Sequence, residues 1–186
     1  MAEYAIASGE REYAEKALKL FKDIQRFLNT PGVLEPKYWN TVQSKGHSIV
    51  MILINTASRI RAAISDPILD TQINESIAAI RRYFMHPEFK ALLEMVGLDG
   101  ELIDTCNGRV INPGHCIETA WFILEEAKHR HWDKDLVQMG IRILEWSWEW
   151  GWDKEYGGII NFRDCRNFPG PVSYTHLRAH ETAANL

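Results

Sequence analysis

The segment best suited to chemistry is NPGHCIETAW, residues 112–121, in which a histidine and a glutamate lie three residues apart. Asparagine is a strong N-cap, and proline suits the first helical position because its φ angle is already fixed. The sequence therefore predicts a helix that begins at Pro113, with His115 in its first turn. Glu118 lies three residues later, so its side chain is expected on the same face as His115.

The start of a helix changes what a histidine can do. Backbone N–H groups without helical partners and the positive end of the helix dipole lie there, and they favour a neutral imidazole and a developing oxyanion. Glu118 is a candidate to orient the ring of His115 or to exchange a proton itself. Such a site is suited to removing a proton next to a carbonyl group. The alternative is that both side chains only cap the helix and face solvent.

Metal binding is not expected here, although an HxxE pair also occurs in carboxylate-bridged metal bundles. Such bundles need a second matching motif, and the sequence contains none. Cys116 adjoins His115, but neighbours on a helix do not face each other, so a Cys–His nucleophile is not expected either. No cofactor is predicted.

Two further residues are weaker candidates for substrate binding. His47 opens a predicted helix, where it would either face a cleft or serve as a capping or surface histidine. Arg109 comes three residues before the Asn112 cap, where it would either hold a substrate hydroxyl or tie down the rim of the fold.

The elements that must position these residues are helices with two kinds of apolar pattern. Three predicted helices carry a single apolar stripe, at residues 13–28, 68–84 and 136–148. Two others, at residues 48–64 and 112–127, are mostly apolar and should be buried. The two kinds alternate along the chain, as expected where outer helices cover inner ones. The pattern predicts an all-α fold, a toroid of helix pairs, with short β excursions near residues 98–101 and 157–162.

The composition is that of an ordinary globular protein. A net charge of −4 and a pI near 6.0 argue against a nucleic-acid partner. The three cysteines, odd in number and without a CxxC motif, indicate a reducing compartment. The longest apolar run, residues 49–54, is too short to cross a membrane, and the first twelve residues do not resemble a signal peptide. We therefore expect a cytoplasmic protein without a membrane partner.

Three segments resemble the N-acylglucosamine 2-epimerase family in order and spacing. Residues 112–122, NPGHCIETAWF, match its NPGHxxExxWF signature. Residues 151–159, GWDKEYGGI, resemble its GWDxxxGG loop, and residues 51–55, MILIN, resemble part of an inner helix. The resemblance covers about residues 10–169. It implies that residues 1–170 form a partial (α/α)6 barrel with short β-hairpin excursions at the rim.

The same resemblance implies a sugar epimerase or isomerase. Members of the family invert carbon 2 of a sugar or interconvert aldoses and ketoses, and the histidine of the NPGH motif is an acid–base residue. That role falls on His115, and the glutamate of the motif, Glu118, is implied to line the same cleft. A small-molecule sugar is the implied partner, and a homodimer is implied for the full-length protein.

The end of the sequence departs from the family pattern. Residues 171–186 resemble translated adapter sequence, so we expect them not to be native and assign no role to His176 or His180. A second catalytic histidine and an arginine-bearing segment of the family have no counterpart here. The chain is therefore expected to be an interior fragment, inactive alone, with apolar helices partly uncovered.

Three alternatives stay open. The first is an aldose–ketose isomerase on the same scaffold, which shares the enediolate chemistry. The second is an (α/α)6 glycoside hydrolase, for which Glu118 and Asp153 would be the two carboxylates. The third is a fragment without catalytic activity.

Overall fold

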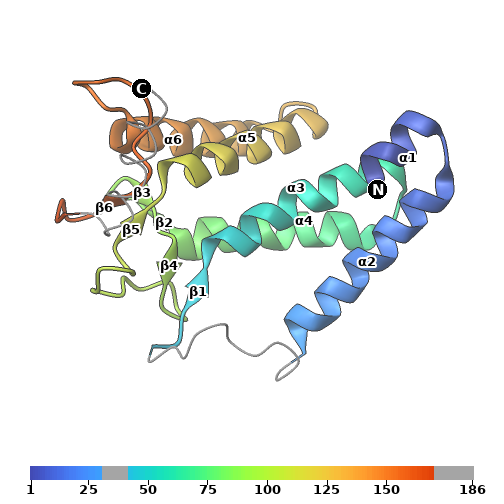
Figure 1. Ribbon diagram of the computed structural model, residues 1–186, viewed down its shortest axis with the longest axis horizontal. Coiled ribbons are helices and arrows are strands. Elements are labelled where there is room, and N and C mark those ends of the chain that lie inside the picture. Colours follow the sequence, from blue (N-terminus) through green and yellow to red (C-terminus); the bar gives the residue numbers. More distant parts are fainter. Residues whose placement is uncertain (31–41, 170–186) are drawn as a thin grey trace, which may run out of the picture. The chain divides into compact units, whose positions relative to one another are not determined.

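The computed structural model describes residues 1–30 and 42–169, which divide into two compact units. Among the described residues, the first unit contains residues 1–30, 42–43 and 52–78, and the second contains residues 44–51 and 79–169. Each unit is described by itself, and Figure 1 gives the labels of the helices and strands.

The described residues of the first unit are mostly helical. Helices α1 (Ala2–Ser8) and α2 (Arg11–Asn29) pack together, joined by Gly9, whose φ of 76° is favourable for glycine. Most of α3 (His47–Ala63) and nearly all of α4 (Pro67–Ala79) complete the unit. α4 begins where the sequence chemistry favours it, because proline occupies its first position and the Asp66 carboxylate accepts the Ile68 N–H at 3.0 Å.

The second unit is built on two packed helices. α5 (Pro113–His129) and α6 (Lys134–Gly151) lie side by side in Figure 1. They approach closely at Gly140, where an added Cβ atom would lie 2.7 Å from Cγ of Leu124. A short π-helix (Ile80–Phe84) continues directly from α4. Asp133 caps α6, since its carboxylate accepts the N–H groups of residues 135 and 136.

Within residues 44–51 and 79–169, the second unit also contains three two-stranded antiparallel ladders. β1 (Lys45–Gly46) pairs with β4 (Met95–Val96), and β2 (Met85–His86) pairs with β3 (Ala91–Leu92). β5 (Val110–Ile111) pairs with β6 (Arg163–Asp164). These short pairs tie the segments before α3 and α5 to the chain between them, and so place the starts of both helices.

The predicted helices are confirmed, each with its ends shifted by a few residues. The sequence patterns did not predict α1 or the pairing of β1 with β4. The prediction of a β-hairpin around residues 98–101 is wrong, because the strand before these residues, β4, does not pair with the chain that follows them. A turn is present there, with the Gly97 N–H donating to the Glu101 oxygen at 2.9 Å, but β4 pairs with β1. The β excursion predicted near residues 157–162 is confirmed by the antiparallel bridge between Trp152 and Ile159.

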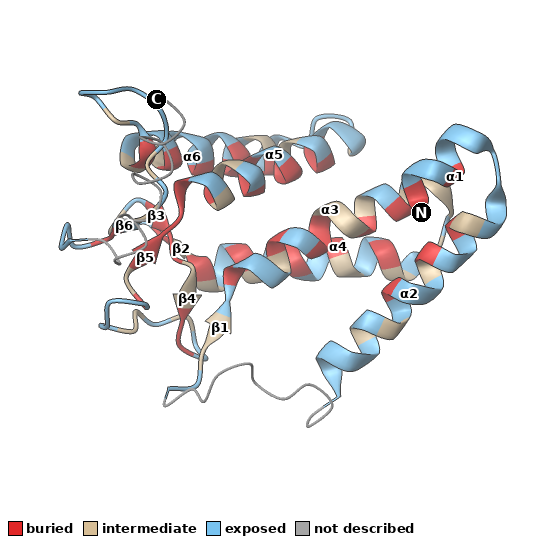
Figure 2. Cartoon of the chain, in the orientation of Figure 1, coloured by how far each residue is buried: buried red, intermediate tan, exposed pale blue. Residues whose placement is uncertain are grey.

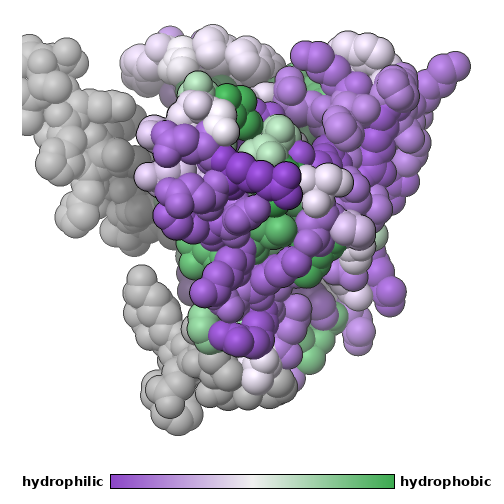
Figure 3. Space-filling view, turned by 90° about the vertical axis from the view of Figure 1, so that its right-hand side faces the viewer, coloured by the Kyte–Doolittle hydropathy of each residue, from purple (hydrophilic) through white to green (hydrophobic). Residues whose placement is uncertain are grey.

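The expectation that the apolar helices are incompletely covered is also confirmed. Ile49 and Ile52 of α3 are each 48% exposed, and Trp121 of α5 is 56% exposed, while their opposite faces are buried (Figure 2). The face that carries α1 and α2 is mostly hydrophilic, with apolar side chains visible between the polar ones (Figure 3). In the part of the chain that the structure describes, no helix combines the length and hydropathy needed to cross a membrane.

Candidate active site

The start of α5 has the predicted cap. Asn112 is buried, and its side-chain oxygen accepts the backbone N–H of His115 at 3.2 Å. The backbone oxygen of Asn112 accepts the N–H of Cys116 at 3.0 Å, and Pro113 occupies the first helical position. The imidazole of His115 therefore projects from the first turn of a fixed helix, as the sequence predicted.

The ring of His115 is held by Glu94, a residue of the segment between β3 and β4. Nδ1 of His115 lies 3.0 Å from one carboxylate oxygen of Glu94, and Nδ1 of His47 lies 3.3 Å from the other. The backbone of Glu94 is fixed on both sides, because its N–H donates to the oxygen of Val110 and its oxygen accepts the N–H of His47, both at 3.0 Å. The strand ladders thus bring one carboxylate between two histidines.

Glu94 is a carboxylate rather than a carboxylic acid at neutral pH. Burial acts to raise the pKa of Glu94, but the hydrogen bonds of His47 and His115, together with the positive charge that each ring carries when it is protonated, outweigh burial and lower that pKa below its usual value. An ionised carboxylate only accepts hydrogen bonds, so each histidine must present a protonated Nδ1 to it. The lone pair of each ring therefore lies on Nε2 when the ring is neutral.

The two histidines differ in access. The side chain of His115 is 37% exposed, and its Nε2 has no partner among the described residues and is not enclosed by protein. The side chain of His47 has no exposed surface, and its Nε2 lies 3.0 Å from the hydroxyl oxygen of Thr119. His115 can therefore meet a bound molecule directly. A direct contact between His47 and substrate would require the ring to leave one of its two partners.

The other two predicted site residues have different surroundings. Glu118 is exposed and makes no hydrogen bond to His115 within the described residues, because Glu94 occupies the Nδ1 side of that ring. Arg109 donates to the carboxylates of Asp164 at 2.8 Å and Asp104 at 2.9 Å, and these bonds raise its pKa. The structure thus groups His47 with His115. Arg109 instead forms ion pairs with Asp164 in β6 and with Asp104 in the loop before β5.

Sequence reasoning missed Glu94 and Thr119. The available signal for Glu94 was a single acidic residue inside the apolar run ALLEMV, residues 91–96, where an unpaired charge would be costly. Thr119 had no comparable signal.

Cys116 adjoins His115, but burial raises the pKa of its thiol, so the expectation that it is not a nucleophile is supported. No group of three potential metal-ligating side chains is found in the described ranges.

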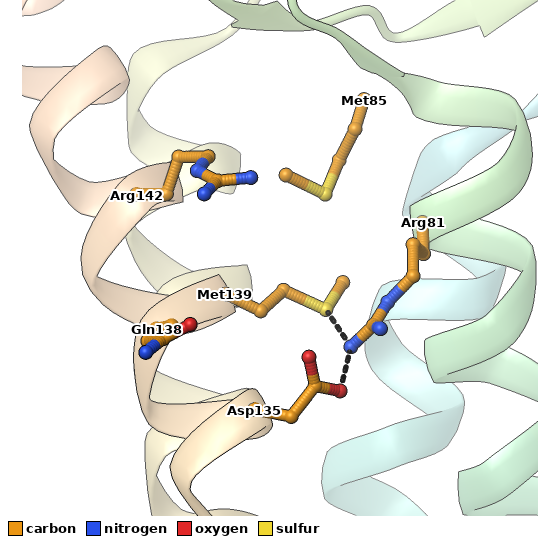
Figure 4. Close-up of a pocket in the computed structure, with 6 residues that line it drawn as sticks. All are labelled: Arg81, Met85, Asp135, Gln138, Met139 and Arg142. Atoms are coloured by element: carbon orange, nitrogen blue, oxygen red, sulfur yellow. Dashed lines mark hydrogen bonds and ion pairs between the residues drawn. The ribbon is translucent and has the colours of Figure 1, made fainter.

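A separate cavity of about 110 Å³ lies between the π-helix and α6. Its lining residues are Arg81, Met85, Asp135, Gln138, Met139 and Arg142 (Figure 4). Arg81 is already paired with Asp135 at 2.5 Å and contacts the sulfur of Met139. Because no histidine lines this cavity, the cluster around Glu94 is the better candidate for proton transfer.

Comparison with known sequences gives a consistent result. The sequence model of the N-acylglucosamine 2-epimerase (GlcNAc 2-epimerase) family matches residues 55–172. The N-acylglucosamine 2-epimerases of Bos taurus and Homo sapiens are 27% and 28% identical to the chain over 163 and 172 residues. These alignments cover 85% and 87% of this chain but 38% and 39% of the two relatives. The chain therefore spans less than half the length of the curated relatives it matches.

Comparison with solved structures identifies the fold. A sugar epimerase from a ruminal bacterium has a TM-score of 0.71 at 19% identity, covering 88% of this chain and 45% of that one. A D-mannose isomerase has a TM-score of 0.58 at 15% identity, covering 69% and 35%. A cellobiose 2-epimerase from Spirochaeta thermophila has a TM-score of 0.59 at 12% identity, covering 88% and 43%. The predicted fold class, part of an (α/α)6 barrel, is confirmed.

Proposed function

Because the chain belongs to the N-acylglucosamine 2-epimerase family, we propose that it is part of a sugar 2-epimerase acting on N-acetylglucosamine or a related free sugar. The observation that carries this proposal is the pairing of His115 with Glu94 at 3.0 Å. It leaves an accessible Nε2 as a base, on a ring whose orientation and tautomer are both set. The substrate class is supported by the names of the family and its relatives.

The proposed chemistry is proton transfer at carbon 2 of the open-chain sugar. The aldehyde makes the carbon-2 proton acidic, and Nε2 of His115 removes it to give a planar enolate, which is an enediolate where carbon 2 carries a hydroxyl group. The imidazolium that forms donates through Nδ1 to Glu94, whose negative charge stabilises it. The positive end of the α5 dipole stabilises the negative charge on the sugar oxygens. Return of a proton to the opposite face gives the epimer.

The remaining predicted site residues take supporting roles in this proposal. Glu118 is exposed near the start of α5, so it is available to a sugar hydroxyl rather than to the ring of His115. Arg109 holds β5 against β6 through Asp164, which is only 2% exposed in its side chain. His47 supports Glu94 from the buried side. The sequence alone suggested that His47 and Arg109 bind the substrate directly. In this proposal His47 instead positions Glu94, and Arg109 positions β5 against β6.

Inversion of a stereocentre by proton transfer needs an acid–base group on each face of the planar enolate. In the part of the chain that the structure describes, His115 is the one accessible histidine of the Glu94 cluster. We therefore expect a second group from outside this chain, and no turnover by the 186-residue chain alone. For the complete protein we propose a homodimer in a reducing compartment such as the cytoplasm, where the three cysteines stay free.

A second candidate is an aldose–ketose isomerase. It is favoured by the structural similarity to a protein described as a D-mannose isomerase. Both reactions begin with the same proton removal at carbon 2, and they differ in where the proton returns. No comparable observation favours a glycoside hydrolase.

Incubation of the complete gene product with free aldoses in deuterated water tests both candidates. By NMR, a 2-epimerase is expected to give the carbon-2 epimer with deuterium at carbon 2, and an isomerase is expected to give a ketose. If no sugar acquires deuterium at carbon 2 and no product forms, the proposed proton transfer is wrong.

A further inference from the structure

His47 has partners of opposite kinds on its two ring nitrogens. Its Nδ1 faces the carboxylate of Glu94 at 3.3 Å, and its Nε2 faces the hydroxyl of Thr119 at 3.0 Å. A neutral imidazole carries one donor nitrogen and one acceptor nitrogen. A carboxylate only accepts, whereas a hydroxyl can donate, so these surroundings match a neutral His47 with its proton on Nδ1.

The hydroxyl of Thr119 has a single proton and two possible acceptors. Its oxygen lies 2.8 Å from the backbone oxygen of His115, one turn earlier in α5, and 3.0 Å from Nε2 of His47. If Thr119 donates to the backbone oxygen, Nε2 of His47 must carry a proton of its own to remain bonded. His47 would then be an imidazolium, because its Nδ1 already donates to Glu94.

The ring of His47 lies in enclosed and partly aromatic surroundings. Its side chain has no exposed surface, and its ring packs against Phe84 with centroids 5.5 Å apart. A charge placed there would lose its hydration and would compete with His115 for the same carboxylate. The hydroxyl of Thr119 can turn its proton from the backbone oxygen of His115, to which it donates at 2.8 Å, toward Nε2 of His47 at 3.0 Å. This donation avoids both costs, and the backbone oxygen of His115 keeps the N–H of the following helical turn as its donor.

We propose that Thr119 and His47 are positioning residues that act on His115 through Glu94, an inference that rests on the proposed proton transfer. Thr119 donates to His47, and His47 stays neutral and donates to Glu94. The carboxylate then keeps its full negative charge for the imidazolium that forms when His115 takes a proton. The titratable groups of this cluster are His47, Glu94 and His115. Protonation of His47 would offset the charge of Glu94 and make His115 a weaker base.

The protonation state of His47 can be measured directly on the folded chain by ¹⁵N NMR of the histidine rings. His47→Gln identifies its signals by their disappearance. The expected result at neutral pH is one protonated and one unprotonated nitrogen, with the proton on Nδ1. Two protonated nitrogens at neutral pH, or a proton on Nε2 alone, would overturn the inference. This readout needs no turnover, so it separates failure of this inference from failure of the proposed function.

Substitution of Thr119 tests the consequence for activity in the complete gene product. Thr119→Val is expected to lower kcat about fivefold to tenfold with little change in KM, which is the effect of one hydrogen bond. Thr119→Ser, which keeps the hydroxyl, is expected to retain activity. Thr71→Val is the matched control, because it removes another intrahelical hydroxyl bond, from Thr71 to the oxygen of Pro67.

The outcomes of this series are distinguishable. Unchanged kcat in a folded Thr119→Val protein, or loss of activity in Thr119→Ser equal to that in Thr119→Val, would contradict the positioning role. If Thr119→Val does not fold, the Thr119→Ser activity and the wild-type ring spectra decide the question.

Discussion

Replacement of Glu94 by glutamine keeps the size of the side chain and removes the charge between two histidines. The amide oxygen accepts a hydrogen bond, but the amide nitrogen only donates, so only one of the two Nδ1–H groups facing Glu94 can keep its acceptor. The other ring must move its proton to Nε2 or give up the bond. If that ring is His115, it loses the lone pair required of a base.

The size of the effect follows from the distance between the two groups. Unit charges separated by the 3.0 Å between Nδ1 of His115 and Glu94 attract by about 5.5 kcal/mol at an effective dielectric constant of about 20. The Glu94 side chain is 19% exposed, so water screens part of this attraction. We expect Glu94→Gln to cost about 2–4 kcal/mol of transition-state stabilisation, or about 30- to 1000-fold in kcat/KM.

The assay compares kcat/KM of wild-type and Glu94→Gln forms of the complete gene product, with thermal unfolding as a check that both are folded. Glu88→Gln is the matched control. Glu88 also pairs with Nδ1 of a histidine, His86 at 2.9 Å, but its side chain is 57% exposed. The control is expected to keep full activity. A folded Glu94→Gln enzyme within about threefold of wild type would refute the reasoning.

Two further predictions concern stability and are measured on the 186-residue chain. Because the pKa of Glu94 is lowered in the folded protein, its stabilising contribution is present above the pKa of an unfolded glutamate, about 4.3, and is lost as pH falls through the lower, folded pKa. The wild-type chain should therefore lose more stability than Glu94→Gln below about pH 4.3 in thermal unfolding. Gly140→Val should lower the free energy of unfolding in urea by about 1–3 kcal/mol, because even a Cβ atom would meet Leu124 at 2.7 Å.

These two predictions have their own controls. Equal loss of stability in acid for the wild-type and Glu94→Gln chains would mean that Glu94 is not held as described. Glu145→Val places the same side chain at an exposed position of α6 and should change the free energy of unfolding by no more than about 0.5 kcal/mol. A similar loss in Glu145→Val and Gly140→Val would show that the close approach of α5 and α6 is not the cause.

The helices were predictable because their signals are local. Apolar periodicity gave the extent of α2, α3 and α6, and the Asn–Pro pair placed the first residue of α5 at Pro113. The family signature pointed to His115 for the same reason, since the motif is one continuous segment, residues 112–122, that covers the cap and the first turns of α5. α1 was missed because seven residues carry too short a pattern to show a period.

The partner of His115 was not predictable because it depends on contacts distant in sequence. Helical spacing made Glu118 the nearest carboxylate, but the ring nitrogen is reached by Glu94, 21 residues earlier. Glu94 arrives there through the pairing of β1 with β4 and through its backbone bond to Val110. Two-residue strands leave almost no pattern in a sequence, so neither this pairing nor the burial of His47 between Glu94 and Thr119 could be inferred.

The most direct test of the central claim is the rate of hydrogen exchange at carbon 2 of the sugar in deuterated water, compared between wild-type and His115→Gln forms of the complete gene product. His129→Gln, at the exposed end of α5, is the control. If Nε2 of His115 moves the proton, exchange falls by about 10²-fold or more in His115→Gln and is unchanged in His129→Gln. Exchange at the wild-type rate in a folded His115→Gln enzyme would contradict the account.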